Sequence, residues 1–290
     1  ARSLGAREVL VVSRHPQGPG QISYAEAAAA HADAEGLFNT TPVGMFPDLE
    51  AQPLDLEPFS RLTFVVDVIY NPLSTRLLQQ ARERGIPCAN GLRMLVAQAK
   101  AAAEHFLGTA LPDGEVDRVC GELTQEMRSL ALIGMPSCGK TTLGRLLAAH
   151  MGREFVDLDE RIEREAGLSI PEIFAREGEP GFRARETAAL RGVAGQQGLV
   201  IATGGGIVTR PENVQLLRAN SALCFVRRDL SRLASADPGR PLSTSAEALQ
   251  RMYAQRLPLY EGAADFSVSN EGAPEDAARR IEDRFKEMFR

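Results

Sequence analysis

The sequence predicts an α/β protein of two domains, each built on a largely parallel sheet. Short apolar runs typical of strands alternate with longer helical patterns along the whole chain. At 290 residues, the chain is also longer than one ordinary α/β domain. A break at residues 109–113, with the sequence TALPD, divides the alternating pattern into two halves. We therefore expect two separate cores.

The first half, residues 1–108, contains the first set of alternating elements. The chain opens on Ala1 and enters an apolar run within a few residues, so we expect its start to lie inside a domain. We predict strands at residues 9–12, 37–39 and 64–70, and helices at residues 24–34, 75–85 and 91–107.

The second half begins after a predicted connecting helix at residues 114–128, for which Asp113 is the candidate N-cap. We place the linker at residues 109–128 and the second domain at residues 129–290. Its predicted strands, with helices between them, are residues 130–133, 155–157, 199–203, 222–226 and 266–268.

Composition narrows the class of partner. No apolar run reaches 18 residues, so we expect no membrane span. The formal net charge of −5 and the pI near 5.6 argue against a nucleic-acid surface and favour small-molecule partners. The four cysteines form no CxxC pair, which fits free thiols in a reducing cytoplasm.

A phosphate-binding loop opens the second half. Residues 134–142 read GMPSCGKTT, which fits GxxxxGK[ST], with an apolar strand before them and a helical run after them. Backbone N–H groups of such a loop point at phosphates, the lysine reaches the β- and γ-phosphates, and the hydroxyl after it ligates Mg²⁺. The sequence therefore predicts an ATP site at Gly134, Met135, Pro136, Ser137, Cys138, Gly139, Lys140, Thr141 and Thr142.

Two carboxylates follow the next strand. Asp157 and Asp159 come at its C-terminal end, where ligand sites of α/β proteins usually lie, and we expect both to face one crevice. Asp157 would hold Mg²⁺ through a water molecule, and Asp159 would accept a hydrogen bond from an acceptor hydroxyl and take its proton. The alternative is that an aspartate here only caps the following helix.

Four further segments carry candidate ligand-binding residues. Arg183 has Glu186 one helical turn later to orient its guanidinium, although such pairs often only face solvent. The glycine run at residues 204–206 would bring backbone close to a ligand, unless it is a plain turn. Residues 234–242, rich in Pro and Gly, read as a lid that carries Arg240. Arg256 precedes Pro258 at a predicted helix end, with a surface arginine as the alternative.

Taken together and in order, these motifs resemble the shikimate kinase family from about residue 129 to residue 290. The motifs are the phosphate loop, DxD, FRxxE, GGG, an RPL lid and RxPLY. The resemblance implies a nucleoside-monophosphate-kinase-like fold and Mg²⁺-dependent transfer of the ATP γ-phosphoryl to the 3-hydroxyl of shikimate, in the shikimate pathway to aromatic amino acids. It also implies the following roles: Lys140 and Arg240 beside the moving phosphoryl; Asp159 and Gly205 at the shikimate hydroxyls; Arg183 and Arg256 at its carboxylate; Phe174 and Phe182 as apolar walls.

The first half resembles part of the NADP-binding domain of shikimate dehydrogenase. The motifs are NTTPVGM at residues 39–45, DVIYNPL at residues 67–73 and NGLRMLVAQ at residues 90–98. The resemblance implies a Rossmann-like fold, with Arg14, Thr40 and Gly91 near the cofactor and Tyr70 and Gln98 near shikimate. No GxGxxG turn precedes residue 9, so we predict a truncated domain without hydride transfer, in which NADP would bind only within a longer parent chain.

Two other functions stay open at this point. One is another small-molecule kinase of the same fold, such as a gluconate kinase, because gluconate also carries a carboxylate and hydroxyls. The other is a nucleotide-binding module without catalysis, which the acceptor residues argue against. We further expect a monomer, and kinase activity that survives deletion of residues 1–108.

Overall fold

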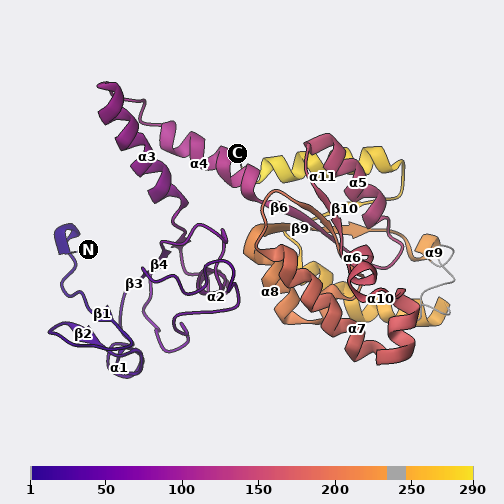
Figure 1. Ribbon diagram of the computed structural model, residues 1–290, viewed down its shortest axis with the longest axis horizontal. Helices are drawn as coiled ribbons and strands as arrows, with labels where there is room; N and C mark the ends of the chain where they lie inside the picture. The colour runs from indigo at the N-terminus through magenta and orange to yellow at the C-terminus, as the bar shows by residue number, and fades with distance from the viewer. Residues whose placement is uncertain (1, 234–245, 290) are drawn as a thin grey trace.

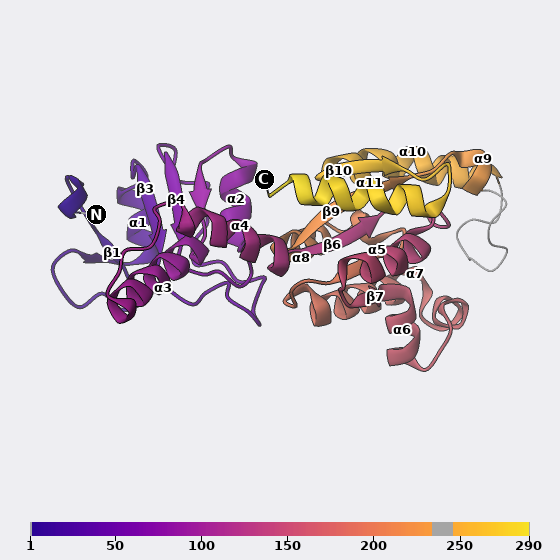
Figure 2. The ribbon, with the colours of Figure 1, turned by 90° about the horizontal axis from the view of Figure 1, so that it is seen from above.

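The computed structural model describes residues 2–233 and 246–289. Both halves build parallel sheets, as the alternating pattern predicts, and lie side by side in the molecule (Figures 1 and 2). The first half contains a three-stranded sheet in the order β3-β4-β5 and a separate parallel pair, β1-β2. The single sheet expected here is thus wrong, because β1 pairs with the unpredicted β2 and not with β3.

The helices and strands of the two halves follow in chain order. In the first half they are η1 (Arg2–Leu4), β1 (Val11–Val12), β2 (Gln21–Ile22), α1 (Tyr24–Ala30), β3 (Gly36–Asn39), β4 (Phe64–Asp67), α2 (Arg76–Glu83), β5 (Cys88–Ala89), α3 (Leu92–Leu107) and α4 (Glu115–Met127). In the second half they are β6 (Ser129–Ile133), α5 (Lys140–Met151), β7 (Phe155–Asp157), α6 (Leu158–Ala166), α7 (Ile170–Ala194), β8 (Val200–Ala202), η2 (Ile207–Thr209), α8 (Pro211–Asn220), β9 (Ser221–Arg227), α9 (Leu230–Leu233), α10 (Ala246–Ala263), β10 (Phe266–Ser269) and α11 (Pro274–Glu287).

The second half is a five-stranded parallel sheet in the order β10-β9-β6-β8-β7. Figure 1 shows α5 and α11 on one side of this sheet and α7 and α8 on the other. Helices on both sides bury the central strands, so every residue of β6 is buried and its sequence, SLALI, is almost continuously apolar. The sheet therefore forms the core of this half, and the carboxyl ends of β6, β7 and β8 meet at one edge.

A helical hairpin joins the two halves. Helix α3 packs against α4, and Leu73, Leu92 and Val96 form a small core with apolar side chains of α4. The predicted N-cap, Asp113, is wrong by one residue, because Gly114 occupies the cap position of α4 with φ −73° and makes no side-chain cap. The connecting helix itself is confirmed.

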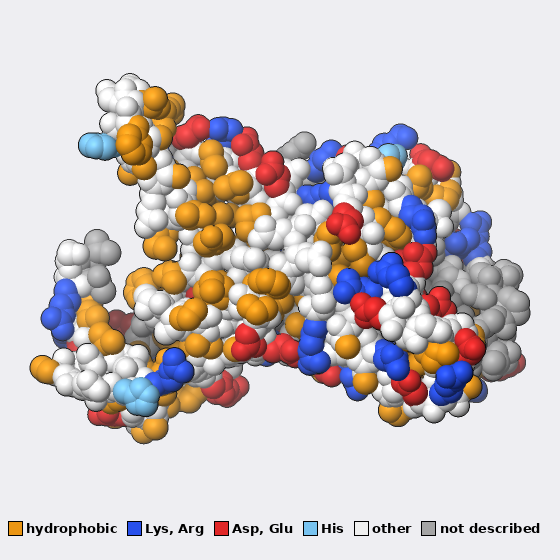
Figure 3. All heavy atoms as spheres, viewed as in Figure 1, with side chains coloured by type: hydrophobic (Ala, Val, Ile, Leu, Met, Phe, Trp, Pro, Cys, Tyr) orange, Lys and Arg blue, Asp and Glu red, His pale blue; other side chains and the backbone are white. Residues whose placement is uncertain are grey.

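The first half exposes more large hydrophobic side chains to solvent than the second half does. Figure 3 shows hydrophobic side chains gathered on the visible face of the first half. Ten of the 12 large hydrophobic side chains that are exposed within the described residues belong to residues 1–108, among them Phe38, Phe64 and Phe106. In the described part of the chain, no helix is long and apolar enough to cross a membrane.

The end of α8 joins the second half to the first. Asn220 is only 1% exposed, and its side-chain oxygen accepts a hydrogen bond from the Leu73 amide at 2.8 Å. Its amide nitrogen donates to Asn71 Oδ1 at 3.3 Å and to the Ala194 carbonyl at 3.2 Å. Leu49 of the first half also lies in the core of the second. We expected kinase activity to survive deletion of residues 1–108. That deletion would remove these buried contacts, which the expectation did not take into account.

Asn220→Ala should lower the free energy of unfolding by about 1–3 kcal/mol, because it leaves the buried Leu73 amide and the Ala194 carbonyl without this partner. Denaturant unfolding of the whole chain measures the change. The matched control is Arg191→Ala, which removes an exposed pair between the halves (2.7 Å to Glu50) and should cost no more than about 1 kcal/mol. Equal losses in the two variants would contradict the role given to Asn220.

Candidate active site

The phosphate loop connects β6 to α5 as predicted. Its backbone takes left-handed values at Gly139 (φ 100°) and at Ser137 (φ 62°), so successive N–H groups turn toward the inside of the loop. Gly139 is the N-cap residue of α5, and a Cβ atom there would lie 2.5 Å from Asn270 Nδ2. The glycine is therefore required both by conformation and by space.

Two side chains of this loop, Lys140 and Cys138, are buried within it. Lys140 is 7% exposed, and its Nζ lies 2.9 Å from the Gly134 carbonyl and 2.8 Å from the Met135 carbonyl. Cys138 is wholly buried, as expected of a small loop residue, and its carbonyl accepts a hydrogen bond from Asn270 Nδ2 at 2.9 Å. Asn270, which directly follows β10, thus fixes the loop with a nearly buried amide, a role that the sequence analysis did not assign to it.

A pair of oxygen ligands lies beside the loop. Thr141 Oγ1 donates to Asp157 Oδ2 at 2.6 Å. Asp157 Oδ1 accepts from the amides of Asp159 (2.9 Å) and Glu160 (3.3 Å), so this side chain also caps α6. The two interpretations of Asp157 are thus compatible. A hydroxyl and a carboxylate that already meet fit Mg²⁺, which is usually held by one or two carboxylates together with phosphate oxygens and water.

The residues predicted to bind the acceptor gather at the glycine run after β8. Arg183 Nη1 lies 2.9 Å from Glu186 Oε2, in the orientation that the sequence predicts, and Glu186 is fully buried. Burial, opposed by Arg183 and assisted by the charge of Asp159, raises the pKa of the Glu186 carboxyl. Arg183 also lies 3.1 Å from Glu179, so two carboxylates fix this guanidinium.

The glycines of the run make room for these side chains. A Cβ atom at Gly204 would lie 2.5 Å from Glu186 Oε1 and 2.9 Å from Asp159 Oδ1. At Gly206 it would lie 2.1 Å from Arg183 Nη2, and at Gly205 it would lie 2.7 Å from Pro136 Cδ. The run is therefore not a plain turn: each glycine packs against a predicted site residue.

Asp157 and Asp159 contact different elements at this edge of the sheet. Asp157 turns to Thr141 of α5, and Asp159 turns to Gly204. These elements follow β6 and β8, two neighbouring strands, so the phosphate side and the acceptor side of the site adjoin. This arrangement suits one aspartate for Mg²⁺ and the other for an acceptor hydroxyl.

Arg256 reaches the same glycines from α10. Its side chain is 9% exposed, and its Nη1 donates to the Gly205 carbonyl at 3.2 Å, which makes it no surface arginine. The predicted helix end before Pro258 is wrong, because α10 continues through this proline to Ala263. The rings of Phe174 and Phe182 pack at 4.8 Å in the small core that flanks Arg183.

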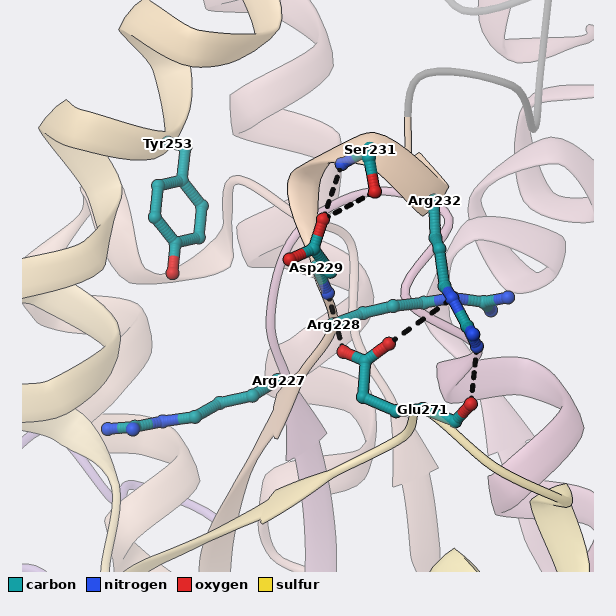
Figure 4. Close-up of a pocket in the computed structure, with 7 residues that line it drawn as sticks. All are labelled: Arg227, Arg228, Asp229, Ser231, Arg232, Tyr253 and Glu271. Carbon is teal, nitrogen blue, oxygen red and sulfur yellow. Dashed lines mark hydrogen bonds and ion pairs between the residues drawn. The ribbon is translucent and has the colours of Figure 1, made fainter.

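A cavity to which the sequence analysis assigned no ligand lies beside the phosphate loop. It has a volume of about 480 Å³. Arg228 lies next to the loop, since its Nη1 would be 3.8 Å from a Cβ atom at Gly139. Glu271 accepts from the Asp229 amide at 2.6 Å and pairs with Arg232 at 3.5 Å (Figure 4). The lining residues are Arg227, Arg228, Asp229, Ser231, Arg232, Tyr253 and Glu271.

Some predicted residues are not placed in this site. Arg240 and the predicted lid around it lie outside the described residues. In the first half, the residues that the dehydrogenase resemblance assigns to ligands are mostly at the surface: Arg14, Thr40, Tyr70 and Gln98 are exposed. Gly91 is buried, and a Cβ atom there would lie 1.8 Å from the Val68 carbonyl. Its role in the structure is close packing.

Fold and site define a class of protein: an α/β kinase with a phosphate loop, a hydroxyl–carboxylate pair beside it and two nearly buried arginines at one sheet edge. A family model described as shikimate kinase matches residues 136–286, more than half of the chain. The chain belongs to the shikimate kinase family.

Individual relatives agree with this. The shikimate kinase of Bordetella avium is 42% identical over 149 residues, which cover 49% of this chain and 71% of the relative. That of Halorhodospira halophila is 45% identical over 157 residues, which cover 52% of this chain and 89% of the relative. The structure of shikimate kinase from Acinetobacter baumannii in complex with shikimate is 34% identical, with a TM-score of 0.55, and covers 58% of this chain and 98% of that one.

One fusion protein is similar over a smaller share. The structure of a chorismate mutase/shikimate 5-dehydrogenase fusion protein from Clostridium acetobutylicum is 33% identical, with a TM-score of 0.38, over 42% of this chain and 47% of that chain.

Proposed function

We propose that the chain is an active shikimate kinase that transfers the γ-phosphoryl group of ATP to the 3-hydroxyl of shikimate. One observation supports this most: the acceptor floor touches the phosphate loop, since Gly205 leaves no space for a Cβ atom beside Pro136 (2.7 Å). An acceptor on Gly204–Gly206 would therefore lie next to the terminal phosphate.

The proposed roles follow from the contacts. The loop amides and Lys140 hold the phosphates, and Thr141 and Asp157 hold Mg²⁺, which when bound neutralises phosphate charge. Arg183 and Arg256 bind the shikimate carboxylate as guanidinium forks. Asp159 orients the 3-hydroxyl and accepts its proton. The sequence-based role of Arg240 at the moving phosphoryl group stays a prediction.

The nucleoside end of ATP would occupy the arginine-lined cavity. The cavity begins at Arg228, beside the first turn of α5, and its volume of about 480 Å³ suits a small ligand. Tyr253 and the guanidinium groups offer flat surfaces on which a purine ring can stack. This would place the base and the acceptor on opposite sides of the phosphate loop.

The first half we interpret as a dehydrogenase-like part without hydride transfer of its own. Its sequence motifs carry this proposal, together with the exposure of Arg14, Thr40, Tyr70 and Gln98. We place the activity in the cytoplasm, since all four cysteines are free thiols. A monomer remains our expectation.

ADP release by the purified chain with Mg²⁺ and ATP tests the function. We expect release that depends on shikimate and stays at the background level with gluconate, because the two arginines and Asp159 form a pocket for a ring with a carboxylate opposite a hydroxyl. Release stimulated by gluconate alone would favour the other kinase. Release that ignores both acceptors would favour a nucleotide-binding module.

A further inference from the structure

Two side chains of α10 converge on one backbone carbonyl. Arg256 Nη1 donates to the Gly205 carbonyl at 3.2 Å, and the hydroxyl of Tyr260 donates to the same oxygen. The two residues are four apart on α10 and so lie on one face, one turn from each other. A carbonyl oxygen has two lone pairs, and both are used here. Gly205 can therefore offer a ligand its N–H but not its carbonyl.

Tyr260 is held rigidly at this point. It is fully buried, and its ring stacks on Phe225 with centroids 5.0 Å apart and planes 20° from parallel. Burial raises the pKa of its phenol, so the hydroxyl keeps its proton and remains a donor at neutral pH. The same hydroxyl lies 3.9 Å from Met135 Sδ, within the phosphate loop. Tyr260 thus touches both the acceptor floor and the phosphate loop.

The Gly205 peptide is the junction between these two parts. On one side it packs against Pro136 of the phosphate loop, where a Cβ atom would lie 2.7 Å from Cδ. On the other side it anchors Arg256, whose guanidinium carries further N–H donors that can bind an anion. A change in the tilt of this peptide would move the acceptor floor and the guanidinium together.

We propose that Tyr260 is a positioning residue for the acceptor: through the Gly205 carbonyl it sets the orientation of the glycine floor and of Arg256 relative to the phosphate loop. Tyr260 does not itself touch the substrate. The inference rests on the proposed function, since it names what holds that acceptor pocket in place. It assigns a role to a residue for which sequence reasoning gave none.

The test is Tyr260→Phe in the full chain, which keeps the ring stack and removes only the hydroxyl. We expect the KM and the calorimetric Kd for shikimate to rise roughly 5- to 10-fold, the scale of one lost hydrogen bond. The KM for ATP should change less than about 2-fold, and kcat less than about 3-fold, because the phosphate loop keeps its own contacts. The split between the two KM values is the signature of positioning.

Phe285→Leu, a substitution in the core away from this site, shows what a loss of stability alone does to shikimate binding. It therefore distinguishes a positioning role of Tyr260 from a purely structural one. Phe285 is fully buried in α11 and packs against Phe289 at 5.2 Å. This variant should lower the unfolding midpoint without altering the KM for shikimate. The proposal would be overturned if Tyr260→Phe also lowered the unfolding midpoint without altering the KM for shikimate, or if it did not fold at all.

A second variant tests the route through Arg256. Tyr260→Phe combined with Arg256→Lys should weaken shikimate binding by less than the product of the two single effects, because both act on the Gly205 carbonyl. Independent effects would overturn the shared route. Wild-type protein without shikimate-dependent turnover would instead refute the proposed function, and the role of Tyr260 would fall with it.

Discussion

Lys140→Met should lower shikimate-dependent turnover by about 10³-fold. Lys140 Nζ is the buried cation inside the phosphate loop, 2.9 Å from the Gly134 carbonyl and 2.8 Å from the Met135 carbonyl. Phosphoryl transfer receives little covalent help from a protein, so the loss of a positioned charge acts directly on the transition state. Initial rates of ADP release at saturating shikimate measure the effect.

The matched control for Lys140 lies on the same helix. Arg145 is an exposed cation of α5 that pairs with Glu160 on α6 and, within the described part of the chain, pairs with no predicted site residue. Arg145→Gln should leave turnover within about 2-fold, since exposed pairs contribute little. Both variants should keep the wild-type unfolding midpoint to within a few degrees. Lys140→Met that retains a tenth of the activity would contradict the assigned role.

The phosphate loop could be predicted from sequence because it is a local structure. Strand, glycines, Lys-Thr and helix all lie within residues 129–151, so chain order alone places Lys140 at the N-terminus of α5. The same holds for Arg183 and Glu186, which lie one turn apart on α7. Such neighbours in sequence are neighbours in space, and their geometry follows from helical periodicity.

Contacts between distant segments could not be predicted in this way. Asn270 reaches the Cys138 carbonyl across 132 residues, and Tyr260 reaches Gly205 across 55. Asn270 lies outside the motifs named above, and Tyr260 closes the RxPLY motif but received no role there, since a buried amide or phenol has the same sequence pattern as any core position. The cavity around Arg228 received no ligand for the same reason, since its lining comes from the end of β9 and the segment after it, from Tyr253 of α10 and from Glu271 after β10.

The predicted ends of helices and strands were wrong where the local preference of a residue competes with tertiary packing. Pro258 normally ends a helix, yet α10 runs through it and presents Arg256 and Tyr260 on one face. In the first half, β1 and β2 are two residues long each and β5 is equally short, which is below what periodicity can detect. The sequence therefore predicted the number of sheets wrongly while it predicted their parallel direction correctly.

Asp159→Asn should lower kcat/KM for shikimate by roughly 10²- to 10⁴-fold, because the amide keeps the shape of the side chain but cannot accept a proton. Asp159 Oδ1 lies 2.9 Å from the position that a Cβ atom would take at Gly204, beside the Glu186 carboxylate (2.5 Å). This places it on the acceptor side of the site, and Asp157 on the Mg²⁺ side. Binding of ATP in the absence of shikimate should therefore be unchanged.

A variant of the neighbouring residue, Glu160, distinguishes a catalytic role of Asp159 from a role at the N-terminus of α6. Glu160→Gln removes a carboxylate from the same first turn of α6, and this carboxylate pairs only with the exposed Arg145 among the described residues. If Asp159 acted chiefly through the helix N-terminus, the two variants would lose activity to a similar extent. A role at the acceptor hydroxyl instead requires that only Asp159→Asn is slow. An Asp159→Asn loss below about 5-fold would refute proton acceptance by this residue.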